Sequence, residues 1–427
     1  MEGVAEGWAN TGLLDPSPHV SILVSIAVPR STGAGSDMTG ERLQPQRLLH
    51  RRIVVKVGSN VLTGGEEGGL HTPTIAAIAT QVAGLVHRGA QVALVTSGAV
   101  AAGRHRLREI EALRDDATRL APRDVQSRQV AAAVGQSRLM ALWDSLFAEA
   151  GVAVGQALLT RRDLADRLGY LNARNTLLAM LDLGVVPVIN ENDVVSVEEL
   201  QDARIGDNDN LSAQVANLVD ADLLLLLTDI AGLYTADPRR DPAARLIERV
   251  ERIDEVIEAA AAGGAGTRGT GGMTTKVQAA RIATGSGTHV VIADGRSRDI
   301  VLRAVAGEPV GTHFLPAGDR IESRRRYLLS GLQARGRVIV DAGAAGALLR
   351  GGNSLLPAGV LRCEGVFQRG DVVQVVTAEG RHLASGTANY ASDEVARIAG
   401  KQSGQIADLL GYEFGEEVIH RNNLVLV

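Results

Sequence analysis

The sequence contains a single cysteine, Cys363, among 427 residues. One thiol cannot form an internal disulfide, a thiolate zinc cage or an iron–sulfur cluster, so we expect a protein of the reducing cytoplasm. Long apolar runs are also missing near the N-terminus. The segment Val20–Val28 is interrupted by serines and is far shorter than the about 20 residues that span a bilayer. The sequence therefore predicts neither secretion nor a membrane partner.

Basic charge is scarce too. The formal net charge is −5 and the pI is near 6.0, which does not favour nucleic acid or an anionic membrane as the main partner. Only Lys56, Lys276 and Lys401 are lysines, and the other 41 basic residues are arginines. Two of these lysines lie in segments rich in glycine and hydroxyl groups. That placement indicates a task for a compact ammonium that a guanidinium cannot perform.

Familiar nucleotide and metal motifs are absent from the sequence. We find no G-x-x-x-x-G-K-[ST] loop, no glycine-rich loop with a catalytic-loop aspartate of the protein-kinase kind, and no H-E-x-x-H helix. Any phosphate binding must therefore follow another design. With 45% hydrophobic and 22% charged residues, the chain has the composition of a folded globular protein, and its length allows two or three domains.

The predicted organisation begins with a flexible leader at residues 1–50, rich in Gly, Ser and Pro; Met38 offers a second start, so translation of residues 1–37 is left open. A domain with α/β periodicity follows at residues 51–323. Apolar runs of strand length alternate there with helical patterns. The runs are Ile53–Val57, Val92–Thr96, Val152–Leu159, Val185–Ile189, Asp222–Thr228 and His289–Ala293. The helical patterns are Thr74–His87, Ser127–Ala150, Leu164–Leu183, Asn210–Val219, Pro242–Ala262, Thr275–Thr284 and Arg298–Val305.

Continuous aliphatic runs such as Leu223–Leu227 indicate strands that are buried on both faces, as in a parallel sheet covered by helices. We therefore predict a three-layer αβα sandwich around a mainly parallel sheet. After a linker at residues 324–334 the strands shorten, and residues 335–427 are predicted to form a small β-rich barrel domain. Ligands of such open sheets bind at the carboxyl ends of the strands.

Polar segments follow several of these strands. Lys56 lies at the end of the first predicted strand beside Gly58 and Ser59, a combination suited to a phosphate, although a strand-end lysine can also simply reach water. Ser97 follows the second strand and enters a helix, where it fits either an anion site or a plain N-cap. Thr228 and Asp229 end the fifth strand, and they suit either the edge of a nucleotide or an ordinary turn.

Two loops are unusually rich in acids and amides, namely Asn190–Asp193 and Gly206–Asn210. They suit an ammonium group, cationic side chains or magnesium, with a turn and helix cap as the alternative. The segment Thr270–Lys276 reads Thr-Gly-Gly-Met-Thr-Thr-Lys and opens a helix. Glycines, a helix N-terminus and an ammonium together predict a polyphosphate cradle, with a flexible surface loop as the alternative.

In this order, the segments resemble the amino-acid kinase family, and within it the bacterial enzymes that phosphorylate the γ-carboxylate of glutamate on the way to proline. The resemblance covers nearly everything from Arg51 to the C-terminus. It rests on Val54–Ser59, Val95–Ala99, Ala132–Leu139, Ile189–Asp193, Gly206–Asn210, Leu226–Asp229, Gly232–Arg239 and Thr270–Lys276. The tail resembles a PUA domain through Gly352–Val360.

The resemblance implies ATP and L-glutamate as substrates, Mg²⁺ on the nucleotide, feedback inhibition by proline and a homo-oligomer. It assigns glutamate binding to Ser97, Asp193 and Asn208. Catalysis is assigned to Lys56, Asp209 and Lys276, which surround the phosphoryl group in flight, and no metal ligand is assigned to the protein. ATP binding is assigned to Lys56, Thr228, Asp229, Thr270, Gly271, Gly272, Met273, Thr274, Thr275 and Lys276.

Two alternatives remain open. One is a kinase of the same fold acting on acetylglutamate, aspartate or carbamate. The other is an RNA-binding protein that acts through its PUA-like tail. Residues 332–427 carry 9 Lys and Arg against 10 Asp and Glu, a net charge of −1, so we do not predict RNA binding.

Overall fold

The computed structural model describes residues 49–63, 69–110, 125–195, 208–263, 272–317 and 334–427. The predicted leader at residues 1–50 and the predicted linker at 324–334 lie outside these ranges, except for residues 49, 50 and 334. Among the described helices, none is long and apolar enough to cross a membrane.

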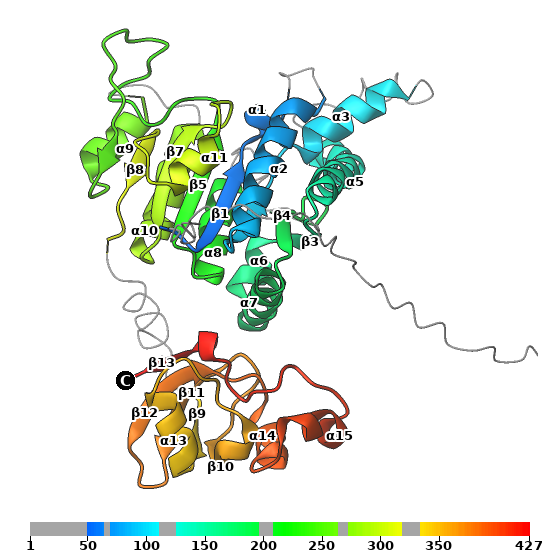
Figure 1. The fold of residues 1–427 in the computed structure, drawn as a ribbon, viewed down its shortest axis with the longest axis vertical. Helices are drawn as coiled ribbons and strands as arrows, with labels where there is room; N and C mark the ends of the chain where they lie inside the picture. The colour runs from blue at the N-terminus through cyan, green and yellow to red at the C-terminus, as the bar shows by residue number, and fades with distance from the viewer. Residues whose placement is uncertain (1–48, 64–68, 111–124, 196–207, 264–271, 318–333) are drawn as a thin grey trace, which may run out of the picture. The chain divides into compact units, whose positions relative to one another are not determined.

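Eight strands from the first part of the chain form one sheet in the order β3-β4-β2-β1-β5-β7-β8-β6 (Figure 1). All neighbouring strands run parallel except β7 and β8, which are antiparallel. The predicted mainly parallel α/β class is confirmed, and each predicted apolar run contributes a strand. The strands are β1 (Arg52–Val57), β2 (Gln91–Val95), β3 (Val154–Leu159), β4 (Val186–Glu191), β5 (Leu223–Thr228), β6 (Arg249–Val250), β7 (His289–Asp294) and β8 (Thr312–Phe314).

Helices cover both faces of this sheet and complete the three layers (Figure 1). One apolar core joins the sheet to α2, α5 and α11, and a second core joins the opposite face to α7, α8 and α10. The helices are α1 (Ser59–Leu62), α2 (Thr72–His87), α3 (Ala99–Glu109), α5 (Val125–Glu149), α6 (Arg161–Ala165), α7 (Arg167–Asp182), α8 (Asn208–Leu218), α9 (Glu255–Ala261), α10 (Gly272–Gly285) and α11 (Ile300–Val305).

Side chains alternate across β1, and this alternation directs its lysine. Ile53, Val55 and Val57 belong to the core beneath α2, α5 and α11, whereas Val54 belongs to the core beneath α7, α8 and α10. Successive side chains of a strand point to opposite faces, so Lys56 lies on the same face as Val54. The ammonium group is thereby directed toward the layer that contains α8 and α10.

The tail forms a separate β-rich sheet in the order β10-β9-β11-β12-β13, packed around its own apolar core. Its strands are β9 (Gly336–Val340), β10 (Val360–Gly365), β11 (Val372–Thr377), β12 (His382–Thr387) and β13 (Leu424–Leu426). Its helical segments are α13 (Ala342–Leu349), η3 (Pro357–Gly359), α14 (Ser392–Ile398), η4 (Ser403–Gln405), α15 (Ile406–Leu410) and η5 (Arg421–Asn423).

The predicted helix Pro242–Ala262 is wrong for most of its length. Arg249 and Val250 instead form β6, which pairs with β8 at the border of the sheet. The helix in this region begins only after Asp254, whose carboxylate accepts the backbone N–H groups of Val256 and Ile257. The apolar spacing suited either structure, and pairing with β8, a strand not predicted from the sequence, favoured extended backbone.

The predicted helix Leu164–Leu183 is divided into α6 and α7. Asp166 separates them with an extended backbone, and its carboxylate accepts the N–H group of Gly169 at 2.8 Å. An aspartate that caps the next helix competes with the helical conformation at its own position. A continuous apolar period therefore concealed a break between two helices.

Candidate active site

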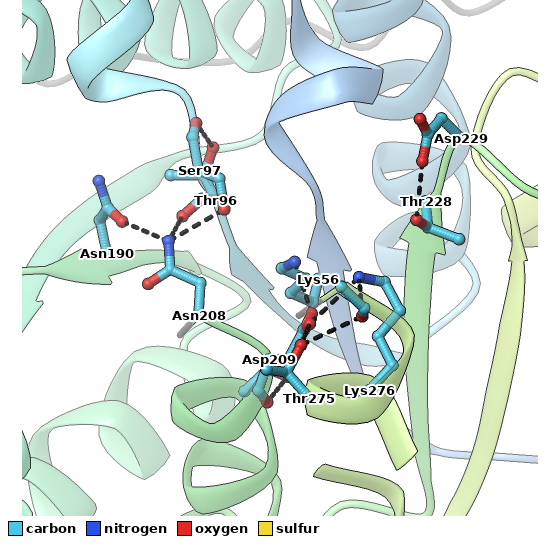
Figure 2. Close-up of polar contacts among 12 residues, drawn as sticks. Lys56, Thr96, Ser97, Asn190, Asn208, Asp209, Thr228, Asp229, Thr275 and Lys276 are labelled. Carbon is cyan, nitrogen blue, oxygen red and sulfur yellow. Dashed lines mark hydrogen bonds and ion pairs between the residues drawn. The ribbon is translucent and has the colours of Figure 1, made fainter. Parts of the chain in front are cut away.

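Strands β1, β2, β4 and β5 end at one edge of the large sheet, where their polar residues come together. Lys56 on β1 pairs in register with Val95 on β2 and Leu226 on β5. Ser97 lies two residues after the end of β2, and Thr228 is the last residue of β5. The first turns of α8 and α10 reach the same region (Figure 2). Residues far apart in the sequence thus meet because parallel strands end on the same side.

A lysine–aspartate site, defined as Lys56, Asp209, Thr275 and Lys276, lies at the centre of this edge. The Lys56 ammonium donates to Asp209 Oδ1 at 2.6 Å, and the Lys276 ammonium donates to Asp209 Oδ2 at 3.1 Å. The Thr275 hydroxyl also donates to Oδ2, at 2.8 Å. Figure 2 shows the carboxylate between the two lysines. Exposure is only 4%, 4% and 8% for Lys56, Asp209 and Lys276, so these charges interact in a poorly solvated environment.

The protonation of Asp209 follows from two opposing effects. Burial raises the pKa of the carboxyl group, because it penalises the charged form. The charges of Lys56 and Lys276, with hydrogen bonds from Lys56 and Thr275, outweigh burial and lower the pKa to about 2. Asp209 is therefore an anion at neutral pH and provides a fixed counter-charge for both ammonium groups.

Helix termini position this site. Asp209 lies in the first turn of α8, where the positive end of the helix dipole stabilises a carboxylate. Lys276 belongs to the N-terminal part of α10, and its ammonium also donates to the backbone carbonyl of Gly272 at 3.0 Å. A cation near a helix N-terminus opposes the dipole, and the Asp209 carboxylate compensates for this cost. The result is a concentration of positive charge available to a phosphate.

Three side-chain amides, from Gln136, Asn190 and Asn208, form a second group that we call the amide cluster. Asn208 Nδ2 lies 2.9 Å from Asn190 Oδ1 and also donates to the Thr96 carbonyl at 2.9 Å and to Ser97 Oγ at 3.0 Å. Asn190 Nδ2 in turn donates to Gln136 Oε1 at 2.8 Å. Hydrogen bonds thus connect β2, β4, α5 and α8 next to the lysine–aspartate site, because Asn208 and Asp209 are neighbours in the sequence.

The turn after β2 brings Ser97 to this cluster. Gly98 has a φ of 95°, a left-handed conformation that glycine adopts without the steric cost of a side chain. The indole N–H of Trp143 on α5 donates to the Thr96 hydroxyl at 3.1 Å and supports the strand end from the other side. Ser97 is buried and accepts a hydrogen bond from Asn208, which is more than an exposed N-cap serine would do.

Thr228 and Asp229 form a third polar group at the end of β5. The Thr228 hydroxyl donates to Asp229 Oδ1 at 3.2 Å, and Asn60 Nδ2 donates to Asp229 Oδ2 at 3.0 Å. Partial burial raises the pKa of Asp229, but the hydrogen bonds from Asn60 and Thr228 outweigh it, so the pKa lies below its usual value. Figure 2 shows Thr228 at the tip of its strand and Asp229 just beyond it.

The remaining predicted site residues divide between described and undescribed positions. Asp193 is half-buried in the turn after β4. Gly272, Met273 and Thr274 open α10, and the Thr274 hydroxyl donates to the Ala261 carbonyl at 3.4 Å. The other two residues of the predicted polyphosphate cradle, Thr270 and Gly271, lie outside the described part of the chain.

Two contributors, Asn60 and Gln136, were not selected from the sequence, and a third, Asn190, was recognised only as part of the polar loop Asn190–Asp193. Asn190 is the penultimate residue of the buried strand β4, and a polar residue near the carboxyl end of such a strand is the signal that selected its loop. Gln136 belongs to the motif Ala132–Leu139, but its position within a long helix gave no sign of its contact with β4. Asn60 follows β1 in the short helix α1, and only the folded chain brings it to Asp229.

The arrangement of charged groups at this site indicates the type of reaction that it supports. Two ammonium groups from opposite ends of the domain sequence share one carboxylate beside a helix N-terminus, and a group of amides lies next to them. Converging cations stabilise the charge that develops on a phosphoryl group in transfer. The fold and site together are those of a phosphotransferase on a parallel α/β sandwich.

Comparison with known proteins identifies the family. Residues 51–294 match the model of the amino acid kinase family, and residues 336–410 match the PUA domain. The chain belongs to the amino acid kinase family.

Its curated relatives narrow the class further. A glutamate 5-kinase from Dehalococcoides mccartyi (strain ATCC BAA-2266 / KCTC 15142 / 195) is 50% identical over 88% of this chain and 99% of its own length. Glutamate 5-kinases from Herpetosiphon aurantiacus and Shewanella amazonensis are 49% and 48% identical over 89% and 88% of this chain. They are covered over 99% and 96% of their own lengths.

Proposed function

We propose that this protein is a glutamate 5-kinase, which transfers the terminal phosphoryl group of ATP to the γ-carboxylate of L-glutamate. The product is L-glutamyl 5-phosphate, and the reaction is the first step of proline biosynthesis. The observation that carries the proposal is the junction of Lys56 and Lys276 on the single carboxylate of Asp209. Similarity to proteins named glutamate 5-kinase, over 88–89% of this chain and 99% of theirs, supports the choice of acceptor.

The chemistry needs no covalent intermediate. An oxygen of the γ-carboxylate attacks the terminal phosphorus of ATP, a new O–P bond forms, and the bond to the departing ADP breaks. The carboxylate is already ionised at neutral pH, so no proton has to be removed from the nucleophile. The protein must instead align two anions and stabilise the charge in flight, which is the task we assign to Lys56 and Lys276. Asp209 holds both ammonium groups in position.

Substrate binding is assigned around these groups. We propose that Ser97, Asp193 and Asn208 hold L-glutamate at the ends of β2, β4 and α8. ATP is assigned to the β5 side, with Thr228, Asp229 and the segment Thr270–Lys276 as its contacts. The N-terminus of α10 supports this assignment, because its backbone N–H groups and dipole favour phosphate.

Mg²⁺ is proposed to enter with the nucleotide. The described residues contain no group of three His, Cys, Asp or Glu side chains that could hold a metal ion. Mg²⁺ commonly binds through substrate phosphates and retains several water molecules, so it does not require a dedicated protein cage. When bound, it neutralises charge on the phosphate oxygens, while the lysines act from the protein side.

Several wider features stay predictions of the proposed function. We propose a kinase domain at residues 51–323 and a PUA-like domain at 335–427, joined by a linker at 324–334 and preceded by the leader. Proline is proposed as a feedback inhibitor of a homo-oligomer in the cytoplasm. The near-neutral tail still gives no reason to propose RNA binding.

The acceptor can be tested directly by measuring ADP release with glutamate, acetylglutamate, aspartate and carbamate at equal concentrations. We expect glutamate to give the highest kcat/KM and a product that hydroxylamine traps, because hydroxylamine attacks acyl phosphates. The reaction without an acceptor is the control for ATP hydrolysis. Faster turnover of any other acceptor would contradict the proposal and would identify the alternative kinase at once.

A further inference from the structure

The amide cluster contains one donor and one acceptor that the described protein leaves unmatched. Gln136 Nε2 and Asn208 Oδ1 are both buried, and neither has a hydrogen-bond partner among the described residues. Buried polar atoms are nearly always paired with protein, ordered water or a ligand, so two unmatched atoms in one connected cluster are available to a bound molecule. They are opposite in character, because one is an N–H donor and the other a carbonyl acceptor.

The orientation of each amide is determined by its surroundings. Asn208 Nδ2 is surrounded by three oxygens, from Thr96, Ser97 and Asn190, so a flipped amide would place oxygen against oxygen. Asn190 Oδ1 accepts from Asn208 and also from the backbone N–H of Glu191 at 2.9 Å. Asn190 must therefore turn its NH₂ group to Gln136 Oε1, and this contact leaves Gln136 Nε2 as the free donor.

Close helix packing holds Gln136 next to the turn that carries Ser97. A Cβ atom on the preceding residue, Gly135, would lie 1.8 Å from the carbonyl oxygen of Ala99, the first residue of α3. A Cβ atom on Gly103 would likewise lie 1.7 Å from the Ala131 carbonyl oxygen. Glycine at both positions lets the two helix backbones touch, and the residue after Gly135 is thereby placed beside the N-terminus of α3.

An α-amino acid matches these two atoms. Its α-carboxylate needs N–H donors, and its α-ammonium needs acceptors. The N-terminus of α3 adds a positive dipole end that favours the carboxylate. A fully ionised phosphate group would satisfy the donor but would leave the acceptor unmatched.

We propose, on the basis of the proposed function, that Gln136 is a specificity-determining residue that donates to the α-carboxylate of the acceptor amino acid while Asn208 Oδ1 accepts from its α-ammonium. The reacting γ-carboxylate then extends from the amide cluster toward the lysine–aspartate site. Discrimination between glutamate and simple carboxylates arises at the amide cluster, and phosphoryl transfer takes place at the lysines.

Two substitutions at the same position test the contact. Gln136→Leu removes the donor, and we expect KM for glutamate to rise about 10- to 100-fold, as for a hydrogen bond to a charged group, with kcat and KM for ATP changed less than about threefold. Gln136→Glu keeps an oxygen for Asn190 Nδ2 but replaces the donor with a negative oxygen. We expect this variant to raise KM for glutamate further than Gln136→Leu does.

The comparison separates a substrate contact from a structural role. If Gln136 only supported Asn190, Gln136→Glu would keep a near-normal KM, and that result would overturn the proposal. An unchanged KM in Gln136→Leu would overturn it as well. Gln126→Leu makes the same substitution at an exposed position of the same helix and controls for general effects on α5. Circular dichroism and Tm verify that each variant is folded.

Glutamate analogues identify which end of the ligand is involved. 4-Aminobutyrate lacks the α-carboxylate, so its inhibition constant against glutamate should change less than about threefold in Gln136→Leu. Glutarate keeps a second carboxylate and lacks the ammonium, so its inhibition constant should rise with KM. Equal weakening of both analogues would contradict the assigned contact. The proposed function is tested separately, by the acceptor screen on the wild-type enzyme. Preference of the wild type for an acceptor other than glutamate would refute the function, whereas the Gln136 variants test only the contact.

Discussion

The lysine–aspartate site and the amide cluster lie side by side, and they differ in what the protein itself satisfies. In the first, each carboxylate oxygen of Asp209 accepts from a protein group, and two ammonium groups share this one carboxylate, so a net positive charge remains. In the second, one donor and one acceptor are left over. The first site is thus prepared for charge that arises only during reaction, whereas the second is prepared for a ligand that is present in the ground state.

The difference separates turnover from binding. Interactions that strengthen only in the transition state change kcat, and contacts made equally in the ground state change KM. We therefore expect substitutions in the lysine–aspartate site to act on kcat and on folding stability. Substitutions around the amide cluster should act on KM for the acceptor.

The largest effect is expected for Asp209→Asn. This substitution leaves the ammonium groups of Lys56 and Lys276 buried without their counter-charge, and breaking a buried ion pair from one side costs about 3–5 kcal/mol. We expect the free energy of unfolding to fall by about this amount in urea titrations at pH 7. Glu308→Gln, which removes an exposed ion pair to Arg303, is the control for loss of a surface ion pair. Equal stability losses in the two variants would show that the lysine–aspartate site has no special energetic role.

The next effect is expected for Lys276→Arg. A bulkier guanidinium misplaces the charge, and losing one preorganised donor to a transition state typically lowers turnover by about 10²- to 10³-fold. We expect kcat to fall by this factor, while KM for glutamate stays within about threefold and circular dichroism shows that the variant is folded. Lys401→Arg makes the same change at an exposed lysine of the tail and should have no effect. Near-normal turnover in Lys276→Arg would refute the assigned role.

The pH dependence of the unfolding free energy tests the same site, with a smaller expected effect. The pKa of Asp209 is lowered from its usual 3.8 to about 2 in the folded protein. A carboxyl group whose pKa is lower in the folded than in the unfolded protein stabilises the fold at pH values above its unfolded pKa. This contribution of about 2 kcal/mol should therefore be present at pH 6 and lost as the pH falls from about 5 to 2. The wild-type minus Asp209→Asn difference in unfolding free energy should shrink over that range. A difference that stays constant down to pH 2 would show that Asp209 is not perturbed.

The smallest effect is expected for Gly135→Ala, which changes the packing of α5 against α3 next to Gln136. The added Cβ would lie 1.8 Å from the Ala99 carbonyl oxygen, so α5 and α3 must separate, at a cost of about 1–3 kcal/mol. We expect lower Tm and a raised KM for glutamate, with little change in kcat. Gly84→Ala in α2 meets only the Arg88 side chain at 3.7 Å and should be neutral or stabilising. A change in kcat alone for Gly135→Ala would contradict the division between the two sites.

Much of the fold was predictable because its strands are buried on both faces. Continuous aliphatic runs such as Leu223–Leu227 identified the strands of the large sheet, and glycine-rich polar segments at their ends indicated the site. The helix Pro242–Ala262 was predicted wrongly, because its apolar spacing does not exclude a short strand and the pairing partner β8 is distant in the sequence. Local pattern can show that a segment is buried, but it cannot show which neighbour covers it.

Some residues of the candidate site could likewise be selected from the sequence, and others could not. The sequence alone shows that lysines are scarce and that acids are clustered. It therefore sufficed to select Lys56, Asp209 and Lys276. Gln136 was missed, and Asn190 was recognised only as part of a polar loop, because the contacts of an amide depend on atoms that are distant in the sequence.

The sequence by itself determined which segments are buried, which strand ends carry polar groups and which charges are available, because these depend on composition and short-range periodicity. Only the tertiary structure decided that the ammonium groups of β1 and α10 share one carboxylate, and that the donor of Gln136 and the acceptor of Asn208 remain unmatched. The physical reason is that hydrogen bonds and ion pairs extend over about 3 Å. The residues that make them here lie up to 169 positions apart, and only the order and register of the strands bring them within reach.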